Sequence, residues 1–248
     1  MNNANHQQQI ALVTGASRGI GAAVARRLAL DGFAVAVNYA ASSGEADALV
    51  AELRAAGAQA IAVQADVAQA DEVRRMFETI EQQLGKVDVL VNNAGVLKTV
   101  PLADTSDALF DQTININLRG TFNTLREAAA RLNDGGRIVN FSSTTLALNM
   151  PGYAVYNATK AAVEAFTHVF AKELRGRNIT VNAVAPGPIA TSLFLDGKTE
   201  EQIQTFAKMP PLQRLGQPDD IAAVVSFLAG PDAGWVNGQI LRVNGGVA

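Results

Sequence analysis

Short apolar runs alternate along the chain with longer segments in which apolar residues recur at helical spacing. In the segment 21–31, for example, Val24, Ala25 and Leu28 share one helix face. Continuous apolar runs are typical of parallel strands that are buried on both faces. This pattern predicts strands at 10–14, 33–38, 60–63, 88–91, 137–141, 179–184 and 239–243, and helices at 21–31, 45–56, 71–84, 107–132 (in one or two pieces), 153–175 and 219–229.

Strands that alternate with helices of this length form right-handed crossovers. We therefore predict an α/β protein: a single doubly wound Rossmann domain with a seven-stranded parallel sheet and helices on both faces. The domain spans 10–248 and follows a disordered polar tail at 1–9. The proline-bounded stretch 188–217 is weakly helical, and it is either a substrate-binding loop or a structural excursion with two short helices.

Local signals mark the ends of the helix at 45–56. Ser42 followed by Glu45 predicts a capping box at its start, and Gly57 predicts its end.

The composition of the chain excludes several classes of function. Of the 248 residues, 48% are hydrophobic and 17% are charged, and the net charge of -3 leaves no basic excess for a nucleic-acid partner. The chain has no cysteine, which excludes thiolate chemistry and cysteine-bound metals, and we expect no metal site. Of the two histidines, His6 lies in the tail and His168 in a predicted helix, where a packed or surface side chain is expected. No membrane span or signal peptide is predicted, so we expect a cytoplasmic protein.

A glycine-rich turn, read as TGASRGIG at 14–21, follows the first predicted strand. Gly15 permits a tight turn, while Gly19 and Gly21 allow close approach of the backbone and close helix packing. Amides at the start of the following helix then meet a pyrophosphate. The turn therefore predicts a dinucleotide site that includes Gly15, Ser17, Arg18, Gly19, Ile20 and Gly21.

The end of the second predicted strand indicates which dinucleotide binds. A site for NAD places an acidic residue there, but this chain reads Asn38, Tyr39, Ala40, Ala41, Ser42 and has no acid before Glu45. Arg18 could supply positive charge to a 2′-phosphate, and Ser42 could donate a hydrogen bond unless it caps the helix. We predict NADP(H) as the cofactor.

Tyr156 and Lys160 lie one helical turn apart and share a face. A nearby ammonium lowers the pKa of a phenol toward the range in which it can exchange a proton. Ser143 follows the fifth predicted strand, at an end where catalytic groups gather. Because side chains alternate along a strand, its neighbour Ser142 is expected to face elsewhere.

With these residues, the chain resembles the short-chain dehydrogenase/reductase family from 10 to 248, and it is most similar to its ketoacyl-carrier-protein reductases and polyhydroxynaphthalene reductases. The resemblance also rests on NNAG at 92–95, Asn117, YNATK at 156–160 and Pro186-Gly187. It implies that Tyr156 is the general acid, Ser143 binds the carbonyl oxygen, Lys160 binds the nicotinamide ribose, and Asn117 holds a water in a proton relay.

The resemblance implies further cofactor contacts. The adenine would meet Asp66 and Val67, the ribose would lie against the Asn93–Gly95 stretch, and the carboxamide would meet Ile189 and Thr191. The complete set of expected cofactor contacts adds Asn38, Tyr39, Ala40, Ser42, Asn93, Ala94, Gly95, Tyr156, Lys160, Pro186 and Gly187 to the residues named above.

The expected substrate is a ketone that is reduced to a secondary alcohol. The pocket wall should be apolar and without fixed charge, which suits a 3-ketoacyl thioester or a cyclic ketone; its expected residues are Leu146, Met150, Tyr153, Leu193 and Phe194. Arg119 and Arg126 either meet an acyl carrier's phosphopantetheine or are solvated surface charges. An NAD-dependent alcohol dehydrogenase and a non-catalytic dinucleotide-binding regulator are the alternatives.

The low charge content suggests that part of the surface is covered by other subunits. Ala161, Ala162, Ala165 and Phe166 suit close packing against a partner helix. Family members commonly form tetramers through such helices and through the final strand region at 244–248. The resemblance therefore implies a homotetramer.

Overall fold

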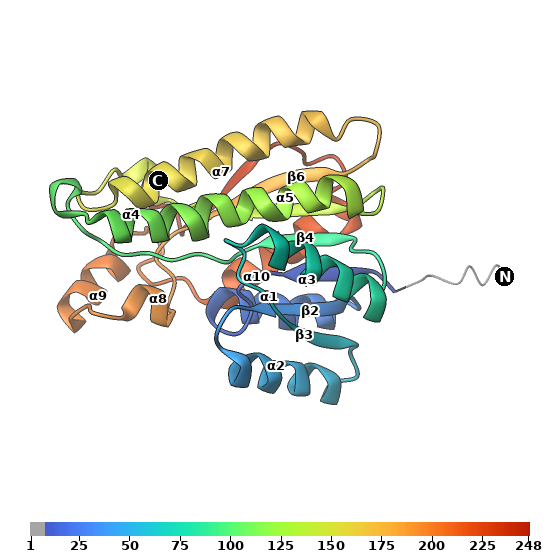
Figure 1. Ribbon diagram of the computed structural model, residues 1–248. Coiled ribbons are helices and arrows are strands. Elements are labelled where there is room, and N and C mark those ends of the chain that lie inside the picture. The colour runs from blue at the N-terminus through green and yellow to red at the C-terminus, as the bar shows by residue number, and fades with distance from the viewer. Residues whose placement is uncertain (1–7) are drawn as a thin grey trace.

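The computed structural model describes residues 8–248, and one parallel sheet organises it (Figure 1). All seven predicted strands are present, in the order β3-β2-β1-β4-β5-β6-β7. Their bounds are β1 (Ile10–Val13), β2 (Ala34–Tyr39), β3 (Ala60–Gln64), β4 (Val89–Asn92), β5 (Arg137–Phe141), β6 (Thr180–Pro186) and β7 (Ile240–Val243). The strand order reverses between β1 and β4, which is where ligands bind in doubly wound sheets.

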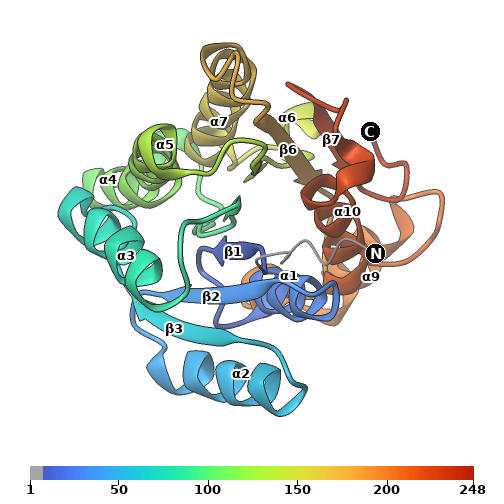
Figure 2. The same cartoon turned by 90° about the vertical axis from the view of Figure 1, so that its right-hand side faces the viewer.

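Helices cover both faces of the sheet (Figure 2). One layer consists of α1 (Gly19–Leu30), α2 (Ser43–Ala55) and α10 (Pro218–Ala229), and the other of α3 (Ala70–Gln83), α5 (Gly120–Arg131) and α7 (Ala154–Glu173). The predicted doubly wound fold is confirmed.

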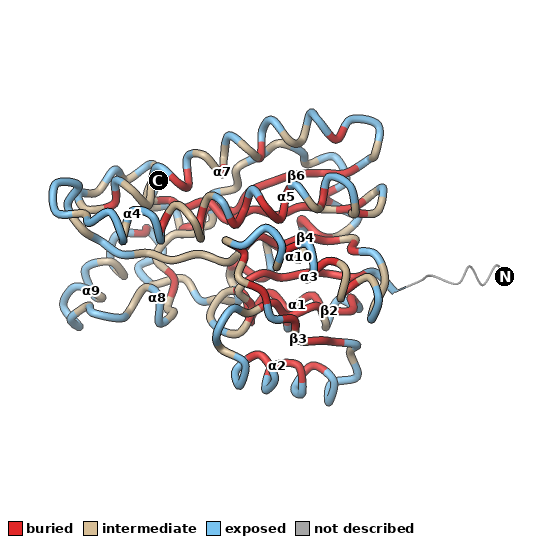
Figure 3. The backbone as a smooth tube through the Cα atoms, viewed as in Figure 1, coloured by how far each residue is buried: buried red, intermediate tan, exposed pale blue. Residues whose placement is uncertain are grey.

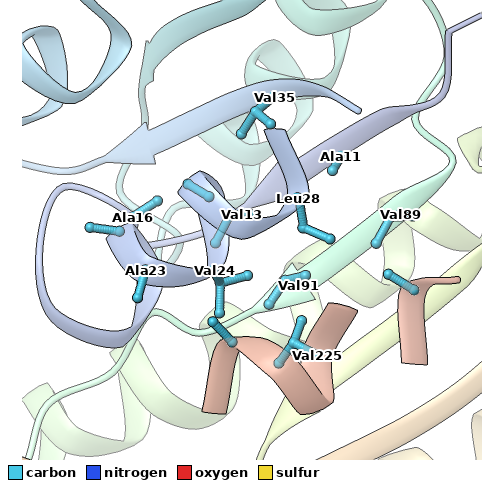
Figure 4. Close-up of a cluster of buried hydrophobic side chains, with 14 of the residues drawn as sticks. Ala11, Val13, Ala16, Ala23, Val24, Leu28, Val35, Val89, Val91 and Val225 are labelled. Atoms are coloured by element: carbon cyan, nitrogen blue, oxygen red, sulfur yellow. The ribbon is translucent and has the colours of Figure 1, made fainter. Parts of the chain in front are cut away.

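Each face of the sheet has its own core. On one face, Val24 and Leu28 of α1 pack with Val225 of α10 over Val13 and Val91 (Figure 4). On the other, the cluster contains Phe77 and Ile80 of α3. The inner strands between them are almost wholly buried, whereas no residue of the edge strand β7 is fully buried (Figure 3). Burial on both faces explains why their sequences read as continuous apolar runs.

The predicted boundary of the N-terminal tail is two residues too late. The Gln9 carbonyl accepts a hydrogen bond from the Ala34 amide (2.8 Å), and Gln8 Nε2 donates to the Gly32 carbonyl (2.9 Å). Gln8 and Gln9 are therefore tied to the domain. The rest of the predicted tail, including His6, lies outside the described residues.

The predicted helix at 107–132 is interrupted. It consists of α4 (Asp107–Thr113), a π-helical segment (Ile114–Arg119) and α5. Single π-helical turns within an α-helix are frequently found at functional sites. Here the wider turn contains the buried Asn117.

The predicted capping box of α2 is wrong. Ser42 does occupy the N-cap position, but its side chain accepts no capping hydrogen bond, since its backbone (φ -90°, ψ 65°) departs from the extended geometry of a capping residue. The predicted helix end is confirmed, because Gly57 follows the C-cap with φ +90°.

The stretch 188–217 contains α8 (Ser192–Leu195) and α9 (Glu200–Lys208), which project at one end of the sheet, on the left in Figure 1. The two short helices of one alternative are present, and residues of both helices line the pocket described below. The remaining short helices are α6 (Thr145–Leu148) and two 3-10 turns (Leu102–Asp104 and Pro231–Ala233). Within residues 8–248, no helix is long and apolar enough to cross a membrane.

Candidate active site

The glycine turn lies between the end of β1 and the start of α1. Gly15 and Gly19 both have left-handed backbones (φ +60° and +58°). A Cβ atom on Gly21 would lie 2.5 Å from Asn93 Nδ2 and 2.6 Å from the Gly15 carbonyl oxygen. Asn93 itself donates to the carbonyls of Thr14 (2.9 Å) and Gly15 (3.0 Å). The turn is thus held against the segment that follows β4, in the middle of the sheet.

We expect Gly21→Ala to lower the free energy of unfolding by about 2 kcal/mol and to weaken dinucleotide binding, because the added methyl group displaces Asn93 or the turn. Gly44→Ala is the matched control, since nothing lies within 4 Å of a Cβ at Gly44. Alanine there should leave stability unchanged or raise it by up to ~1 kcal/mol. Urea unfolding and a fluorescence titration measure the two effects; equal stability of both variants would contradict this role of Gly21.

A cavity of about 380 Å³ opens beside this turn. It is lined by sixteen residues that the sequence places at the cofactor: Gly15, Ser17, Arg18, Gly19, Ile20, Gly21, Asn38, Tyr39, Ala40, Ser42, Asp66, Val67, Asn93, Ala94, Gly95 and Thr191. We call it the dinucleotide cleft. Sequence reasoning missed Ile116, Ser192 and Asp196, which also line it. Ile116 comes from the π-helical segment and Asp196 from the turn after α8, and neither belongs to a recognisable motif.

The predicted residues of the cleft differ in whether their side chains are bonded within the protein or available to a ligand. Asn38 is buried and committed to the protein: its Oδ1 accepts from the Gly15 amide (3.1 Å), and its Nδ2 donates to the Ala65 carbonyl (3.0 Å). It braces the turn against β2 and β3. By contrast, Arg18 is exposed and the Ser42 hydroxyl is released from capping. These two side chains can meet a ligand in the cleft.

The three expected catalytic side chains come together where β5 ends beside α7. Ser143 follows β5 by two residues and hydrogen-bonds Tyr156 of α7. Lys160, one turn further along α7, is buried and donates to the Phe141 carbonyl (2.7 Å). Its Nζ lies 5.6 Å from the centre of the Tyr156 ring. The geometry therefore groups Ser143, Tyr156 and Lys160 as the sequence predicts.

The proton affinities of this group differ from the sequence expectation. Removal from water raises the pKa of Tyr156 to about 12, although the hydrogen bond to Ser143 acts in the opposite direction. Burial also lowers the pKa of Lys160 to about 8. The expectation that Lys160 brings the pKa of Tyr156 down toward neutrality is therefore wrong for this arrangement, because desolvation dominates and the ammonium faces the Phe141 carbonyl.

Ser142 and Asn117 are both engaged elsewhere. The Ser142 hydroxyl donates to Glu164 Oε1 (2.6 Å), which agrees with the choice of Ser143. Asn117 Oδ1 accepts from the Val96 amide (2.8 Å) and its Nδ2 donates to the Val96 carbonyl (2.9 Å). Asn117 lines neither cavity of the site. Its side-chain amide therefore holds the segment that follows β4.

A second, largely apolar cavity adjoins the dinucleotide cleft; we call it the substrate pocket. Of the five expected wall residues, Met150, Tyr153, Leu193 and Phe194 line it. The expectation for Leu146 is wrong, because Leu148 at the end of α6 lines the pocket instead. The other predicted residues Ser143, Tyr156, Lys160, Pro186, Gly187 and Ile189 also line it.

Several pocket residues carried no sequence signal for this role, among them Leu97, Val247 near the C-terminus, and Phe206 and Met209 of the 188–217 stretch. Phe206 stacks edge-on against Phe194 with ring centres 5.2 Å apart. Lys198 Nζ lies 4.5 Å from the centre of the Phe194 ring. The two short helices α8 and α9 therefore form one aromatic wall.

Arg119 and Arg126 lie outside this pocket. Both line a separate groove with Phe122 and Phe166, and the Arg126 guanidinium lies 5.2 Å from the centre of the Phe122 ring. His168 is likewise remote: it is exposed on α7, and its Nδ1 lies 2.9 Å from the Gly238 carbonyl oxygen. A packed or surface histidine was expected, and His168 is at the surface. Ser143 therefore has no imidazole partner among the described residues.

Known proteins share this architecture over nearly the whole chain. The model of a family described as enoyl-(acyl carrier protein) reductase matches residues 15–248. A short-chain type dehydrogenase/reductase from Picea abies is 43% identical over 96% of this chain and 92% of its own. The 3-oxoacyl-[acyl-carrier-protein] reductase FabG of Staphylococcus aureus is 45% identical over 96% and 97%, respectively.

Among solved structures, a short-chain dehydrogenase from Burkholderia cenocepacia in complex with NADP superposes with a TM-score of 0.92. The two sequences are 40% identical, and the match covers 99% of the Burkholderia chain and 98% of this one. The chain belongs to the short-chain dehydrogenase/reductase family of oxidoreductases.

Proposed function

We propose that the protein reduces a ketone to a secondary alcohol with NADPH. The observation that carries this proposal is that the dinucleotide cleft and the substrate pocket meet: Ile20, Asn93 and Gly95 line both cavities. A cofactor that extends from the glycine turn and a substrate in the pocket would thus react beside Ser143, Tyr156 and Lys160.

The cleft fits a dinucleotide that carries a 2′-phosphate. A methyl group on Gly15 or Gly21 would collide with backbone at less than 3 Å, so the turn requires glycine where a pyrophosphate approaches. No carboxylate follows β2 before Glu45, while Arg18 and Ser42 are free to bind a phosphate. The NADP complex of the Burkholderia relative supports the same choice.

Arg18→Ala should weaken NADPH binding by about 10-fold and leave NADH binding within about twofold, because a charge-assisted bond to the 2′-phosphate is worth about 1.5–3 kcal/mol. Titrations of the wild type and the variant with both cofactors measure this. A wild type that binds NADH more tightly than NADPH would refute the assignment.

Each catalytic side chain has a defined task. Tyr156 donates its hydroxyl proton to the carbonyl oxygen as the bound cofactor supplies hydride to the carbonyl carbon. Ser143 hydrogen-bonds the same oxygen, and Lys160 binds the nicotinamide ribose. Ile189 and Thr191 contact the carboxamide, Asp66 and Val67 bind the adenine, and Asn117 supports a proton relay by holding a water.

The substrate pocket favours an apolar ketone. Its wall is aliphatic and aromatic, and Lys160 is its one ionisable group apart from the two tyrosines. Both a 3-ketoacyl thioester and a cyclic ketone fit this chemistry, and the Staphylococcus relative supports the thioester. A panel of ketones that includes acetoacetyl thioesters, run with NADPH and NADH, tests the proposal. Absence of NADPH oxidation across the panel would refute it.

We also propose that the protein is a homotetramer. Ala161 and Ala165 form an exposed strip of small side chains on α7, and Phe122 on α5 is 44% exposed beside Phe166. Light scattering should report four times the subunit mass of 26.0 kDa. A mass of 26.0 kDa would refute self-association.

A further inference from the structure

Ser143 is held by a hydrogen-bonded chain that begins in the wall of the substrate pocket, where Thr145 also lies, and ends at Asn157, which does not line the pocket. Ser143 Oγ lies 2.9 Å from the Oγ1 of Thr145, the first residue of α6. Thr145 Oγ1 in turn lies 2.6 Å from Oδ1 of Asn157, and Asn157 Nδ2 donates to the Thr145 carbonyl (3.0 Å). Asn157 directly follows Tyr156 on α7, so the chain returns to the helix that carries the general acid.

The direction of each bond follows from the groups that take part. The Thr145 carbonyl can only accept, so the Asn157 amide must turn its nitrogen toward it and its oxygen toward the Thr145 hydroxyl. That oxygen cannot donate, and the single hydroxyl proton of Thr145 is therefore committed to it. Toward Ser143, Thr145 Oγ1 can then act only as an acceptor.

The Ser143 hydroxyl consequently donates to Thr145. Its lone pairs are left for the Thr145 amide, 3.2 Å away. The donors run in one order, from Ser143 to Thr145 to Asn157. When a carbonyl oxygen enters the pocket, rotation about the Ser143 Cβ–Oγ bond is enough to move the serine's proton onto it.

We propose that Thr145 and Asn157 are positioning residues for the reduction: they fix the side-chain rotamer of Ser143, so that its hydroxyl is held where the carbonyl oxygen enters. Thr145 also lines the substrate pocket, whereas Asn157 does not. Neither residue lies at a position to which the sequence assigns a role in the site. The inference rests on the proposed ketone reduction.

Thr145→Val tests the proposal, because valine keeps the shape and the backbone amide but has no hydroxyl. We expect kcat to fall by about 10- to 100-fold with KM within about threefold, since the loss concerns the orientation of a group already in the site. Thr145→Ser restores the hydroxyl and should recover most of kcat. Asn157→Leu should match Thr145→Val, and the double variant should be no worse than either single one.

The pH profile separates positioning from loss of stability. The Ser143 hydroxyl lowers the pKa of Tyr156, because the same rotation about Cβ–Oγ lets it donate to the phenolate. When that bond is loosened, alcohol oxidation, which requires the deprotonated tyrosine, should begin at higher pH in Thr145→Val. Thr167→Val is the matched control: it removes a buried hydroxyl on α7 that bonds Asn140 (2.9 Å), so it should lower the melting temperature without moving the profile.

The activity of the wild type distinguishes failure of the proposed function from failure of the positioning role. If the wild type reduces no ketone, the proposed function fails. If the wild type is active and Thr145→Val keeps kcat within about twofold with an unchanged pH profile, or Thr145→Ser is as impaired as Thr145→Val, the positioning role is overturned. Should Thr145→Val not fold, as judged by NADPH binding, Asn157→Leu carries the same test.

Discussion

Tyr156→Phe is expected to lower kcat for ketone reduction by about 1000-fold, because phenylalanine has no proton to give to the carbonyl oxygen. The ring, which packs edge-on against Tyr153 (6.4 Å between centres), is kept. The variant should therefore fold, and it should bind NADPH as the wild type does. Absorbance of NADPH measures turnover, and fluorescence measures binding.

Tyr153→Phe provides the comparison for this result. Tyr153 lines the same pocket but lies one turn before the hydrogen-bonded group, so loss of its hydroxyl should alter KM rather than abolish turnover. Unchanged activity of Tyr156→Phe would remove Tyr156 from the mechanism. It would also favour the alternative that the protein binds a dinucleotide without catalysing a reaction.

Lys160→Met is expected to lower kcat/KM by about 100-fold or more, because the ammonium that we propose to bind the nicotinamide ribose is lost. The same substitution has a predicted effect on stability. Burial lowers the pKa of Lys160 from 10.5 to about 8, so the buried ammonium opposes folding at neutral pH.

The sign of the pH effect follows from proton linkage. Between about pH 8 and 10.5 the unfolded chain holds the lysine proton and the folded chain has released it. Stability from this group therefore rises with pH across that window. Relative to Lys160→Met, the wild type should gain of the order of 2 kcal/mol between pH 7 and pH 10. Urea unfolding at the two pH values measures it, and a constant difference would contradict a buried, charged lysine.

Most of the fold follows from the sequence because parallel strands buried on both faces leave an unmistakable apolar pattern. The bounds of β5 are those predicted, and the glycine turn lies where its spacing places it. The π-helical segment is different: nothing in the periodicity of 107–132 marks the wider turn, which contains Asn117 and its long-range bonds to Val96.

The site residues were predictable where a side chain has one possible role, and not where it can hydrogen-bond to several alternative partners. Ser143, Tyr156 and Lys160 converge as expected. Ser42 was expected to cap a helix, but a hydroxyl caps only at suitable backbone angles, which tertiary structure decides. Asn38 was expected to contact the cofactor, but its side-chain amide is hydrogen-bonded to Gly15 and Ala65.

The residues of the pocket wall were also only partly predictable from the sequence. Leu148 rather than Leu146 lines it because α6 is a single turn, whose rotation relative to the pocket no short-range pattern reveals. Val247 joins the wall from the opposite end of the chain. Such contacts depend on long-range packing, and one sequence carries no periodic signal for them.

The central claim is that hydride passes from a nicotinamide bound in the cleft to a ketone held beside Tyr156. The most direct test is a single turnover with NADPH deuterated at the transferring position of the nicotinamide, followed by mass spectrometry of the alcohol. The account predicts that the deuterium appears on the carbinol carbon and that Tyr156→Phe forms no such product. Alcohol without deuterium, or no alcohol with any ketone of the panel, would contradict it.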